Sequence, residues 1–229
     1  RDVLTALLEA LGAKVIALGR TDTFVPLDTE AVAQDDITRA KDWAKQHQFD
    51  AIFSTDGDAD RPLIGNENGQ WMRGDIVGLL CAQYLQAQAV ATPISCNTAI
   101  EQSHLFANVT RTRIGSPYVI EAMQHMQMAG QNNIVGFEAN GGFLLGSHLT
   151  KNGHTLAPLA TRDAALPILS LLAMAKEKNC KLSQLCNNLP ARFTASDRIQ
   201  NFPTETSRKI LQQLSHDLTA IDALLSPLN

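Results

Sequence analysis

Apolar runs of strand length alternate with amphipathic helical patterns along this chain. A helical pattern at residues 3–11 precedes the apolar run at 15–18, and another at residues 37–44 leads into the apolar run at 51–53. Strands that alternate with helices pack in layers, with the helices covering the faces of a sheet. The predicted fold class is therefore α/β, with two consecutive sandwich-like α/β domains of mixed sheets and flanking helices, plus a partial C-terminal segment.

This alternation occurs twice, and a less regular segment follows it. The first domain is predicted at residues 1–91 and the second at residues 92–190, whereas residues 191–229 contain one predicted helix at 206–214. A strand normally precedes the first helix of an α/β unit. Because a helix opens this chain, we expect a piece of a longer protein that lacks its first strand. The second domain is predicted to contain strands at 93–96, 109–114, 133–137 and 143–146 and helices at 99–105, 117–128, 162–177 and 182–186.

The composition argues against several classes of protein. Of the 229 residues, 45% are hydrophobic and 18% are charged, and the net charge is −4, so neither disorder nor a nucleic-acid partner is expected. Residues 76–100 are uncharged, but polar residues interrupt them too often for a membrane span of about 20 apolar residues. The sequence opens without a signal-peptide pattern, and its four cysteines show no zinc-site or disulfide-rich spacing. We therefore expect a cytoplasmic protein with no membrane partner.

Three aspartates alternate with small residues shortly after the apolar run at 51–53. Asp56, Asp58 and Asp60 are separated by Gly57 and Ala59. A loop at the carboxyl end of a buried strand is where α/β sheets usually bind ligands. Three carboxylates in a tight loop repel one another unless a cation neutralises them, and all-oxygen ligands favour a hard cation. The pattern predicts a Mg²⁺ site.

Other interpretations of this acidic loop stay open. Aspartate and glycine are common turn residues, so the loop is also consistent with an acidic surface turn. A calcium-binding loop is disfavoured because Arg61 stands at its sixth position, where glycine is needed. In a dehalogenase-type phosphatase Asp56 would be the nucleophile and Asp58 the acid, which leaves Asp60 and Arg61 unexplained. Arg61 suits either a salt bridge to a carboxylate or a forked contact to a phosphate.

Three segments of the chain resemble functional loops of one enzyme family. The segment STDGDADR at residues 54–61 resembles the metal loop of the α-D-phosphohexomutases, the phosphomannomutase and phosphoglucomutase group. The segment GFEANGG at 136–142 is similar to the sugar-binding loop of that family, and TRIGS at 112–116 is similar to a second substrate loop. Their order and spacing agree with the family over nearly the whole chain.

The resemblance implies a place for each predicted domain. Members of the family have four domains, which carry in turn a phosphoserine, the metal loop, the sugar loop and a phosphate-binding loop. By this resemblance residues 1–91 are the second domain, residues 92–190 are the third, and residues 191–229 are the beginning of the fourth. The nucleophilic phosphoserine would lie outside this chain.

The resemblance also implies an activity. The parent enzyme would interconvert hexose 1-phosphate and hexose 6-phosphate, with mannose and glucose phosphates as substrates, through the phosphoserine and a hexose bisphosphate intermediate. This chain alone would be inactive. The implied roles are Mg²⁺ ligands for Asp56, Asp58 and Asp60, a catalytic contact to the phosphoryl group for Arg61, and substrate contacts for Glu138, Asn140, Gly115 and Ser116.

The glutamate segment departs from the pattern of the family. Many members read Gly-Glu-x-Ser-Gly-His, whereas here Phe137 stands between Gly136 and Glu138. Asn140 replaces the serine, and Gly142 stands where the histidine would be. The implied reaction class is unchanged, and the sugar and the general acid and base are left open.

Two other functions remain as alternatives: the dehalogenase-type phosphatase and a non-catalytic metal- or sugar-binding module. Candidates outside the three segments have ordinary explanations. His148 and His154 lie in a predicted polar loop, where solvated histidines are common. Arg162 and Asp163 open a predicted helix. A contact from Arg162 to a phosphate through the same loop is one interpretation, but a local pair and the helix dipole explain both residues.

Overall fold

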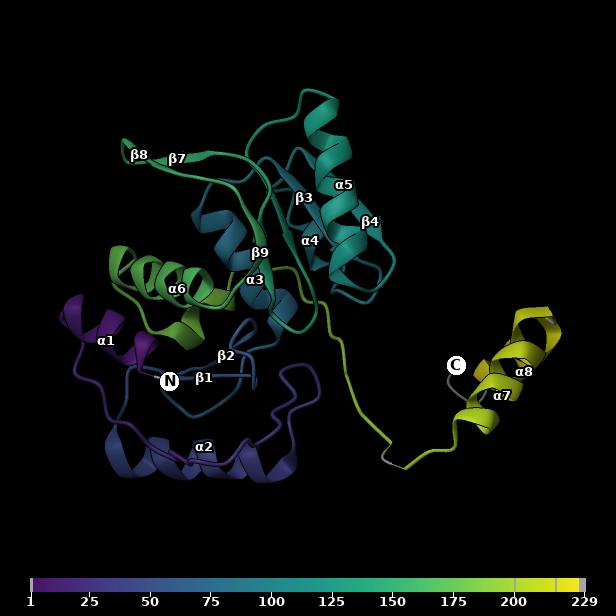
Figure 1. Ribbon diagram of the computed structural model, residues 1–229, viewed down its shortest axis with the longest axis horizontal. Helices are drawn as coiled ribbons and strands as arrows, with labels where there is room; N and C mark the ends of the chain where they lie inside the picture. The colour runs from purple at the N-terminus through teal and green to yellow at the C-terminus, as the bar shows by residue number, and fades with distance from the viewer. Residues whose placement is uncertain (1, 200, 217, 227–229) are drawn as a thin grey trace. The chain divides into compact units, whose positions relative to one another are not determined.

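The computed structural model describes residues 2–199, 201–216 and 218–226. The chain forms two compact units, Arg1–Ala195 and Ser196–Asn229, and each is described by itself (Figure 1). The second unit contains helices α7 (Thr204–His216) and α8 (Leu218–Leu225). The helix predicted at residues 206–214 is α7, whereas the sequence patterns give no indication of α8.

The first unit contains all three segments that carry the family resemblance. Its elements in chain order are α1 (Val3–Ala10), α2 (Gln34–His47), β1 (Ile52–Thr55), β2 (Pro62–Gly65), α3 (Gly74–Tyr84), β3 (Ala89–Pro93), α4 (Ala99–Gln102), β4 (Asn108–Thr112), α5 (Ser116–Met128), β5 (Ile134–Phe137), β6 (Phe143–Leu145), β7 (Leu149–Lys151), β8 (His154–Leu156), β9 (Leu159–Asp163), α6 (Ala165–Glu177) and the short 3-10 helix η1 (Leu182–Cys186).

The N-terminal part of this unit is built on the antiparallel hairpin β1–β2. In Figure 1 this hairpin lies between α2 and α6. The turn that follows β2 is held by Asn66, whose side-chain oxygen accepts the N–H groups of Asn68 and Gln70 at 2.9 and 3.1 Å. Gly69 has a φ of 69° and packs against the backbone of Ala40 in α2. This turn therefore fixes α2 against the hairpin.

The remainder of the first unit is built on a five-stranded mixed sheet with the order β4-β3-β5-β6-β9. Strand β3 runs parallel to β4 and β5, whereas β6 is antiparallel to both β5 and β9. The carboxyl ends of β3, β4 and β5 consequently lie at one edge of the sheet. Ligands of α/β sheets bind at such an edge.

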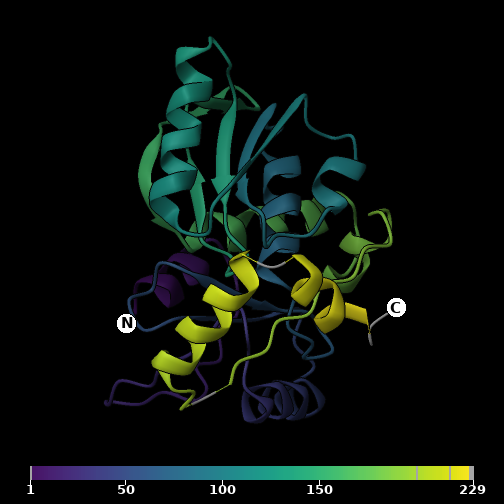
Figure 2. The ribbon, with the colours of Figure 1, turned by 90° about the vertical axis from the view of Figure 1, so that its right-hand side faces the viewer.

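Helices cover both faces of the five-stranded sheet, which confirms the α/β fold class. Helix α5 packs on one face against β3, β4 and β5, and α3 and α6 pack together on the other (Figure 2). The side chains of β3 alternate accordingly. Ala89 and Ala91 pack with Met123 of α5, whereas Val90 belongs to the larger core that contains α3 and α6. That core also includes Ile64 of β2, and the predicted division between residues 91 and 92 stays a prediction.

Two predicted strands are placed differently in the structure. Residues 15–18 form no strand, because among the described residues no strand lies beside them to satisfy their backbone groups, and Ile16 is 42% exposed. The strand predicted at residues 93–96 is β3, which ends at Pro93 and is followed by a turn in which Cys96 N donates to Pro93 O at 3.1 Å. The sequence pattern did not predict residues 89–92 as a strand, because two of them are alanines and alanine has a low strand propensity.

The segment before α6 also differs from the prediction. The helix predicted at residues 162–177 begins at Ala165, because the preceding residues pair with β6 as strand β9. His148 lies directly before β7 and His154 lies in β8, so this stretch is a hairpin rather than a loop, and both histidines are exposed. The helix predicted at residues 99–105 is the shorter α4. The other predicted strands and helices of this domain agree within a few residues.

None of the helices in the described part of the chain combines the length and the apolar character that crossing a bilayer requires.

Candidate functional site

The acidic loop, residues 56–61, follows β1 and is closed by its own backbone. Asp56 Oδ1 accepts the N–H groups of Asp60 and Arg61, each at 3.2 Å, and Asp56 N donates to Arg61 O at 3.2 Å. Ala59 adopts a φ of 62°, in the left-handed region. A small residue tolerates this conformation better than a β-branched one, which suits the alanine at this position.

The three aspartates of this loop converge on one point. One carboxylate oxygen from each of Asp56, Asp58 and Asp60 lies within 4.8 Å of the others. Asp56 is buried and Asp58 is exposed. Among the described residues, the buried Asp60 Oδ1 atom has no hydrogen-bond partner. An unpartnered oxygen beside two other carboxylates fits a hard divalent cation, which takes oxygen ligands.

Arg61 balances part of the negative charge. Its Nε atom lies 3.4 Å from Asp56 Oδ2 and 3.7 Å from Asp60 Oδ1. Burial raises the pKa of Asp56 above its ordinary value of 3.8, and the charges of Asp58 and Asp60 add to this rise, whereas the backbone N–H and the guanidinium of Arg61 oppose it. One guanidinium does not neutralise three carboxylates, so the loop retains an attraction for a cation.

The glutamate loop, residues 138–142, follows β5 and is more buried than the acidic loop. Glu138 is 4% exposed, and its Oε2 atom has no hydrogen-bond partner among the described residues. Gly141 N donates to Glu138 O, and Gly142 N donates to Asn140 Oδ1, both at 3.0 Å. Asn140 Oδ1 is thus used within the loop, which leaves its amide nitrogen as the donor toward a ligand. The Oε2 atom of Glu138 is suited to accept a hydrogen bond from a hydroxyl group.

Distant segments of the chain fix the glutamate loop. Thr29 Oγ1 donates to Asn140 O at 2.7 Å across 111 residues of sequence. Gly74, at the start of α3, lies so close that a Cβ atom there would come within 2.2 Å of Gly141 N and 2.4 Å of Ala139 O. Only a residue without a side chain permits such an approach.

Arg162 joins the two loops. Its Nη2 atom lies 2.5 Å from Asp60 Oδ2, and its Nη1 atom lies 3.5 Å from Glu138 Oε2. The prediction of a local pair with Asp163 is wrong, because Asp163 accepts the backbone N–H groups at the start of α6 instead. The acidic loop and the glutamate loop therefore border a single site. From sequence, a local pair is favoured for Arg162 over a contact to phosphate, because no local pattern distinguishes it from other arginines.

Gly115 and Ser116 follow β4 at the same edge of the sheet as the glutamate loop, because β4, β3 and β5 are parallel neighbours. Gly115 is the residue that caps α5, with a φ of 125° that favours glycine. Its carbonyl group accepts the N–H groups of Tyr118 and Val119. The role of these two residues in substrate binding stays a prediction.

A second charged cluster, which no sequence pattern indicates, acts electrostatically together with Glu138. Asp75 is fully buried; its Oδ2 atom accepts Asn97 N at 2.9 Å, and its Oδ1 atom lies 3.5 Å from Arg73 Nε. Burial raises the pKa of Glu30, the charge of Arg73 opposes this rise, and the charges of neighbouring carboxylates, including Asp75 and Glu138, add to it.

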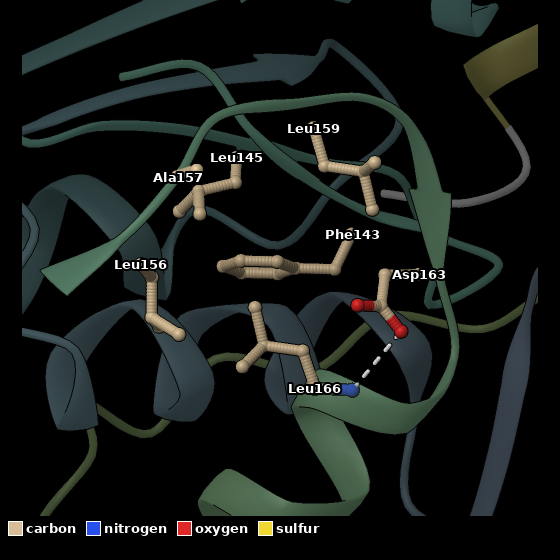
Figure 3. Close-up of a pocket in the computed structure, with 7 residues that line it drawn as sticks. All are labelled: Phe143, Leu145, Leu156, Ala157, Leu159, Asp163 and Leu166. Atoms are coloured by element: carbon tan, nitrogen blue, oxygen red, sulfur yellow. Dashed lines mark hydrogen bonds between the residues drawn. The ribbon is translucent and has the colours of Figure 1, made fainter. Parts of the chain in front are cut away.

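Figure 3 shows an apolar pocket of about 110 Å³, lined by Phe143, Leu145, Leu156, Ala157, Leu159, Asp163 and Leu166. Asp163 is the one polar side chain of this lining, and it accepts the N–H group of Leu166. Ligand pockets usually measure about 300–1,000 Å³. The volume and the lack of a free charge make this pocket unsuitable for a sugar phosphate, so the candidate site is the charged one.

Comparison with known sequences gives consistent results. The family described as "Phosphoglucomutase/phosphomannomutase, alpha/beta/alpha domain III" matches residues 73–193. A phosphomannomutase of Salmonella muenchen is 53% identical over 211 residues, which are 92% of this chain and 44% of that protein. A phosphomannomutase of Sinorhizobium fredii (strain NBRC 101917 / NGR234) is 43% identical over 226 residues, 99% of this chain and 48% of that protein. The chain spans about half the length of the curated relatives it matches.

Comparison with solved structures supports the fold. A crystal structure of a phosphoglucomutase/phosphomannomutase family protein from Burkholderia thailandensis superposes with a TM-score of 0.59 at 18% sequence identity. The superposition covers 82% of this chain and 39% of that one. At this level of identity the similarity shows the shared layered α/β fold.

Proposed function

The chain belongs to the phosphoglucomutase/phosphomannomutase family, and on that premise we propose that it is the central part of a phosphohexomutase. The proposed reaction interconverts hexose 1-phosphate and hexose 6-phosphate through a phosphoserine outside this chain and a hexose bisphosphate intermediate. The observation that carries the proposal is the ion-pair bridge from Asp60 through Arg162 to Glu138. This bridge brings a loop suited to a cation and a carboxylate suited to a sugar to one site.

Asp56, Asp58 and Asp60 would hold Mg²⁺, with the unpartnered Oδ1 atom of Asp60 as one ligand. When bound, the metal supplies electrostatic stabilisation of the phosphoryl group during transfer. Arg61 lies beside the same carboxylates and is assigned a contact to phosphoryl oxygens, for which a guanidinium is well suited. In this arrangement the acidic loop attracts and orients the phosphoryl group.

Glu138 is assigned to the hydroxyl groups of the sugar. Recognition through hydroxyl groups suits a bisphosphate that must bind in two orientations, since either phosphate can then face the acidic loop while the sugar stays oriented. Asn140, Gly115 and Ser116 are assigned further substrate contacts near this edge. Mannose and glucose phosphates are the proposed substrates, and both curated relatives described above are named phosphomannomutases.

The domain assignment belongs to the same proposal. Residues 1–91 are assigned to the second domain of the parent enzyme, residues 92–190 to the third, and residues 191–229 to the beginning of the fourth. The family match at residues 73–193, which is described as domain III, supports the second of these assignments. A cytoplasmic location stays a prediction from the sequence.

The dehalogenase-type phosphatase is not favoured. Its nucleophile would be Asp56, whose Oδ1 atom already accepts two backbone N–H groups within the loop. That mechanism also gives no role to the buried Glu138 or to the bridge that Arg162 forms.

A coupled assay of the full-length protein with mannose 1-phosphate, glucose 1,6-bisphosphate and Mg²⁺ tests the proposed function. We expect mannose 6-phosphate without net release of inorganic phosphate, and a rate at least about 100-fold lower for Glu138→Gln. Glu121→Gln, on the exposed surface of α5, is the matched control and should retain the activity. Release of phosphate instead of the 6-phosphate would indicate a phosphatase. Binding without either product would indicate a non-catalytic module.

A further inference from the structure

We propose that Arg162 is a positioning residue that holds Asp60 and Glu138 in place while leaving one oxygen of each carboxylate free for a ligand. This inference rests on the proposed function, because Glu138 is taken as the sugar-binding group. It goes further by giving a task to a residue of β9 that lies outside the three segments of the family resemblance. It also explains why residue 142 of this chain is a glycine.

The two contacts of Arg162 are unequal. The contact to Asp60 Oδ2, at 2.5 Å, is a close ion pair, whereas the contact to Glu138 Oε2, at 3.5 Å, leaves that oxygen without a hydrogen-bond partner. Asp60 Oδ1 is likewise unpartnered among the described residues. Arg162 therefore supplies positive charge to both carboxylates and makes a close ion pair with only one of their oxygens.

The difference between the two Arg162 distances affects how Glu138 can bind a sugar. Without a nearby positive charge, Glu138 and the aspartates of the acidic loop would repel one another in a poorly solvated site. If instead the guanidinium formed a close pair with Glu138, it would occupy the oxygen that a sugar hydroxyl needs. Because Asp60 holds the guanidinium at the shorter distance, Glu138 stays both balanced in charge and available.

Gly142 provides the space for the arginine side chain. A Cβ atom at position 142 would lie 2.6 Å from Arg162 Cδ and 3.2 Å from Arg162 Cγ, so the aliphatic part of Arg162 passes directly over this glycine. An alanine at position 142 would displace the side chain of Arg162 from this path.

The backbone of Arg162 is anchored through the residue that follows it. Asp163, the next residue, pairs with Phe143 in the sheet, and its side chain accepts the N–H groups of Ala165 and Leu166 at 2.8 and 3.2 Å. The side chain of Arg162 is 20% exposed, so it is not a solvated surface arginine. A fixed backbone position is what a residue needs in order to hold two loops at a constant separation.

The first test measures the dissociation constant of mannose 1-phosphate for the full-length protein in the absence of metal. Arg162→Gln retains most of the aliphatic side chain but removes the charge, and we expect binding to weaken about 10- to 100-fold. Arg162→Lys keeps a charge near the carboxylates and should recover a large part of this loss. Arg39→Gln, which removes an exposed ion pair on α2, is the matched control and should bind as the wild type does.

The second test asks whether Gly142 acts through Arg162. Gly142→Ala should weaken sugar-phosphate binding in the wild-type background, and the same change should have little further effect in an Arg162→Ala background, where the obstructing atoms are absent. Such non-additivity is the signature of two residues that act through one contact. Circular dichroism and thermal unfolding of each variant identify any that fails to fold, and Arg162→Lys remains as the mildest change.

The possible outcomes are distinct. If the wild-type protein binds no hexose phosphate, the proposed function fails and this inference fails with it. If the wild-type protein binds and Arg162→Gln binds equally well, only the inference fails. Additive effects of Gly142→Ala and Arg162→Ala would also overturn it, and a loss that Arg162→Lys recovers, together with non-additivity, would support it.

Discussion

The acidic loop and the glutamate loop border the same site but are stabilised differently. The acidic loop is closed by local contacts, in which Asp56 accepts the N–H groups of residues four and five positions later. The glutamate loop also closes locally, but its backbone is held in place by Thr29 and Gly74, both more than 60 residues away, and Arg162 contacts both loops. One loop is therefore specified by its own sequence, and the other depends on the packing of the whole unit.

This difference predicts how each loop tolerates change. Substitutions in the acidic loop should alter cation binding with little effect on folding, because half of the loop is exposed and its backbone is closed by its own hydrogen bonds. Substitutions at the contacts of the glutamate loop should destabilise the fold, because buried backbone segments meet there without intervening side chains.

Gly74→Ala should have the largest effect on stability. Its Cβ atom would come within 2.6 Å of three backbone atoms of the glutamate loop, which have no room to move. We expect the free energy of unfolding to fall by about 3 kcal/mol, measured by urea denaturation of the full-length protein. A change below about 1 kcal/mol would show that the glutamate loop is not held by this contact.

Two charge-neutralising substitutions should separate the functions of the loops. Asp58→Asn removes an exposed ligand candidate and should weaken Mn²⁺ binding at least about 10-fold while the affinity for mannose 1-phosphate changes much less. Glu138→Gln should do the reverse, because it removes the carboxylate assigned to the sugar. Isothermal titration of each variant with each ligand measures both effects. If both variants weakened Mn²⁺ binding equally, the division of roles between the loops would be wrong.

The turn at residues 66–69 is stabilised by one local and one distant set of contacts, so the two kinds of contact can be compared within a single turn. Glu67 accepts hydrogen bonds from the hydroxyl group and the backbone N–H of Ser183 in η1. Burial alone would raise the pKa of Glu67, but these hydrogen bonds outweigh it and hold the pKa below the ordinary value of 4.5. A depressed pKa means that the ionised form stabilises the folded state above pH 4.5, and that this stability is lost as the pH falls through the folded-state pKa.

Glu67→Gln should therefore lower the free energy of unfolding by about 0.5–1 kcal/mol at pH 7, after allowing for solvent screening. The difference from the wild type should disappear in acid. Asn66→Ala removes the local hydrogen bonds of the same turn and is the control, since its effect should not depend on pH. Denaturation curves at pH 7 and pH 3.5 measure both. A difference for Glu67→Gln that persisted unchanged in acid would contradict this assignment.

Gly57→Ala should have the smallest effect, in contrast to Gly74→Ala. A Cβ atom at Gly57 would meet only the ring of Phe24, and this side chain is 74% exposed and free to rotate away. We expect a change in the free energy of unfolding within about 0.5 kcal/mol. A loss as large as that of Gly74→Ala would show that the acidic loop is also held by remote packing.

The difference between local and distant contacts also explains which structural features could be predicted from the sequence. The fold class and most elements of the sheet domain followed from alternating apolar patterns, because these patterns report which side of each element is buried. Residues 15–18 were misjudged because strand formation needs a neighbouring strand, which a local pattern does not reveal. Strand β3 was predicted too far along the chain, because its alanines, which allow close packing against α5, have a low strand propensity.

The residues of the candidate site also fall into those that the sequence could predict and those that it could not. Asp56, Asp58 and Asp60 could be selected from sequence because their spacing alone brings their carboxylates together. The Arg162 bridge could not, because Asp60 and Arg162 meet only after β9 has joined the sheet beside β6. The preference for Gly142 also becomes understandable only once the side chain that passes over it is known.

The central claim is that the acidic loop holds a divalent cation beside a sugar bound at Glu138. The most direct measurement is the paramagnetic effect of Mn²⁺ on the NMR relaxation of ¹³C-labelled mannose 1-phosphate bound to the full-length protein. We expect strong relaxation enhancement of the sugar carbons, which Asp58→Asn reduces at a limiting Mn²⁺ concentration while the sugar remains bound. Binding of both ligands without any such enhancement would place the metal and the sugar at separate sites and contradict the account.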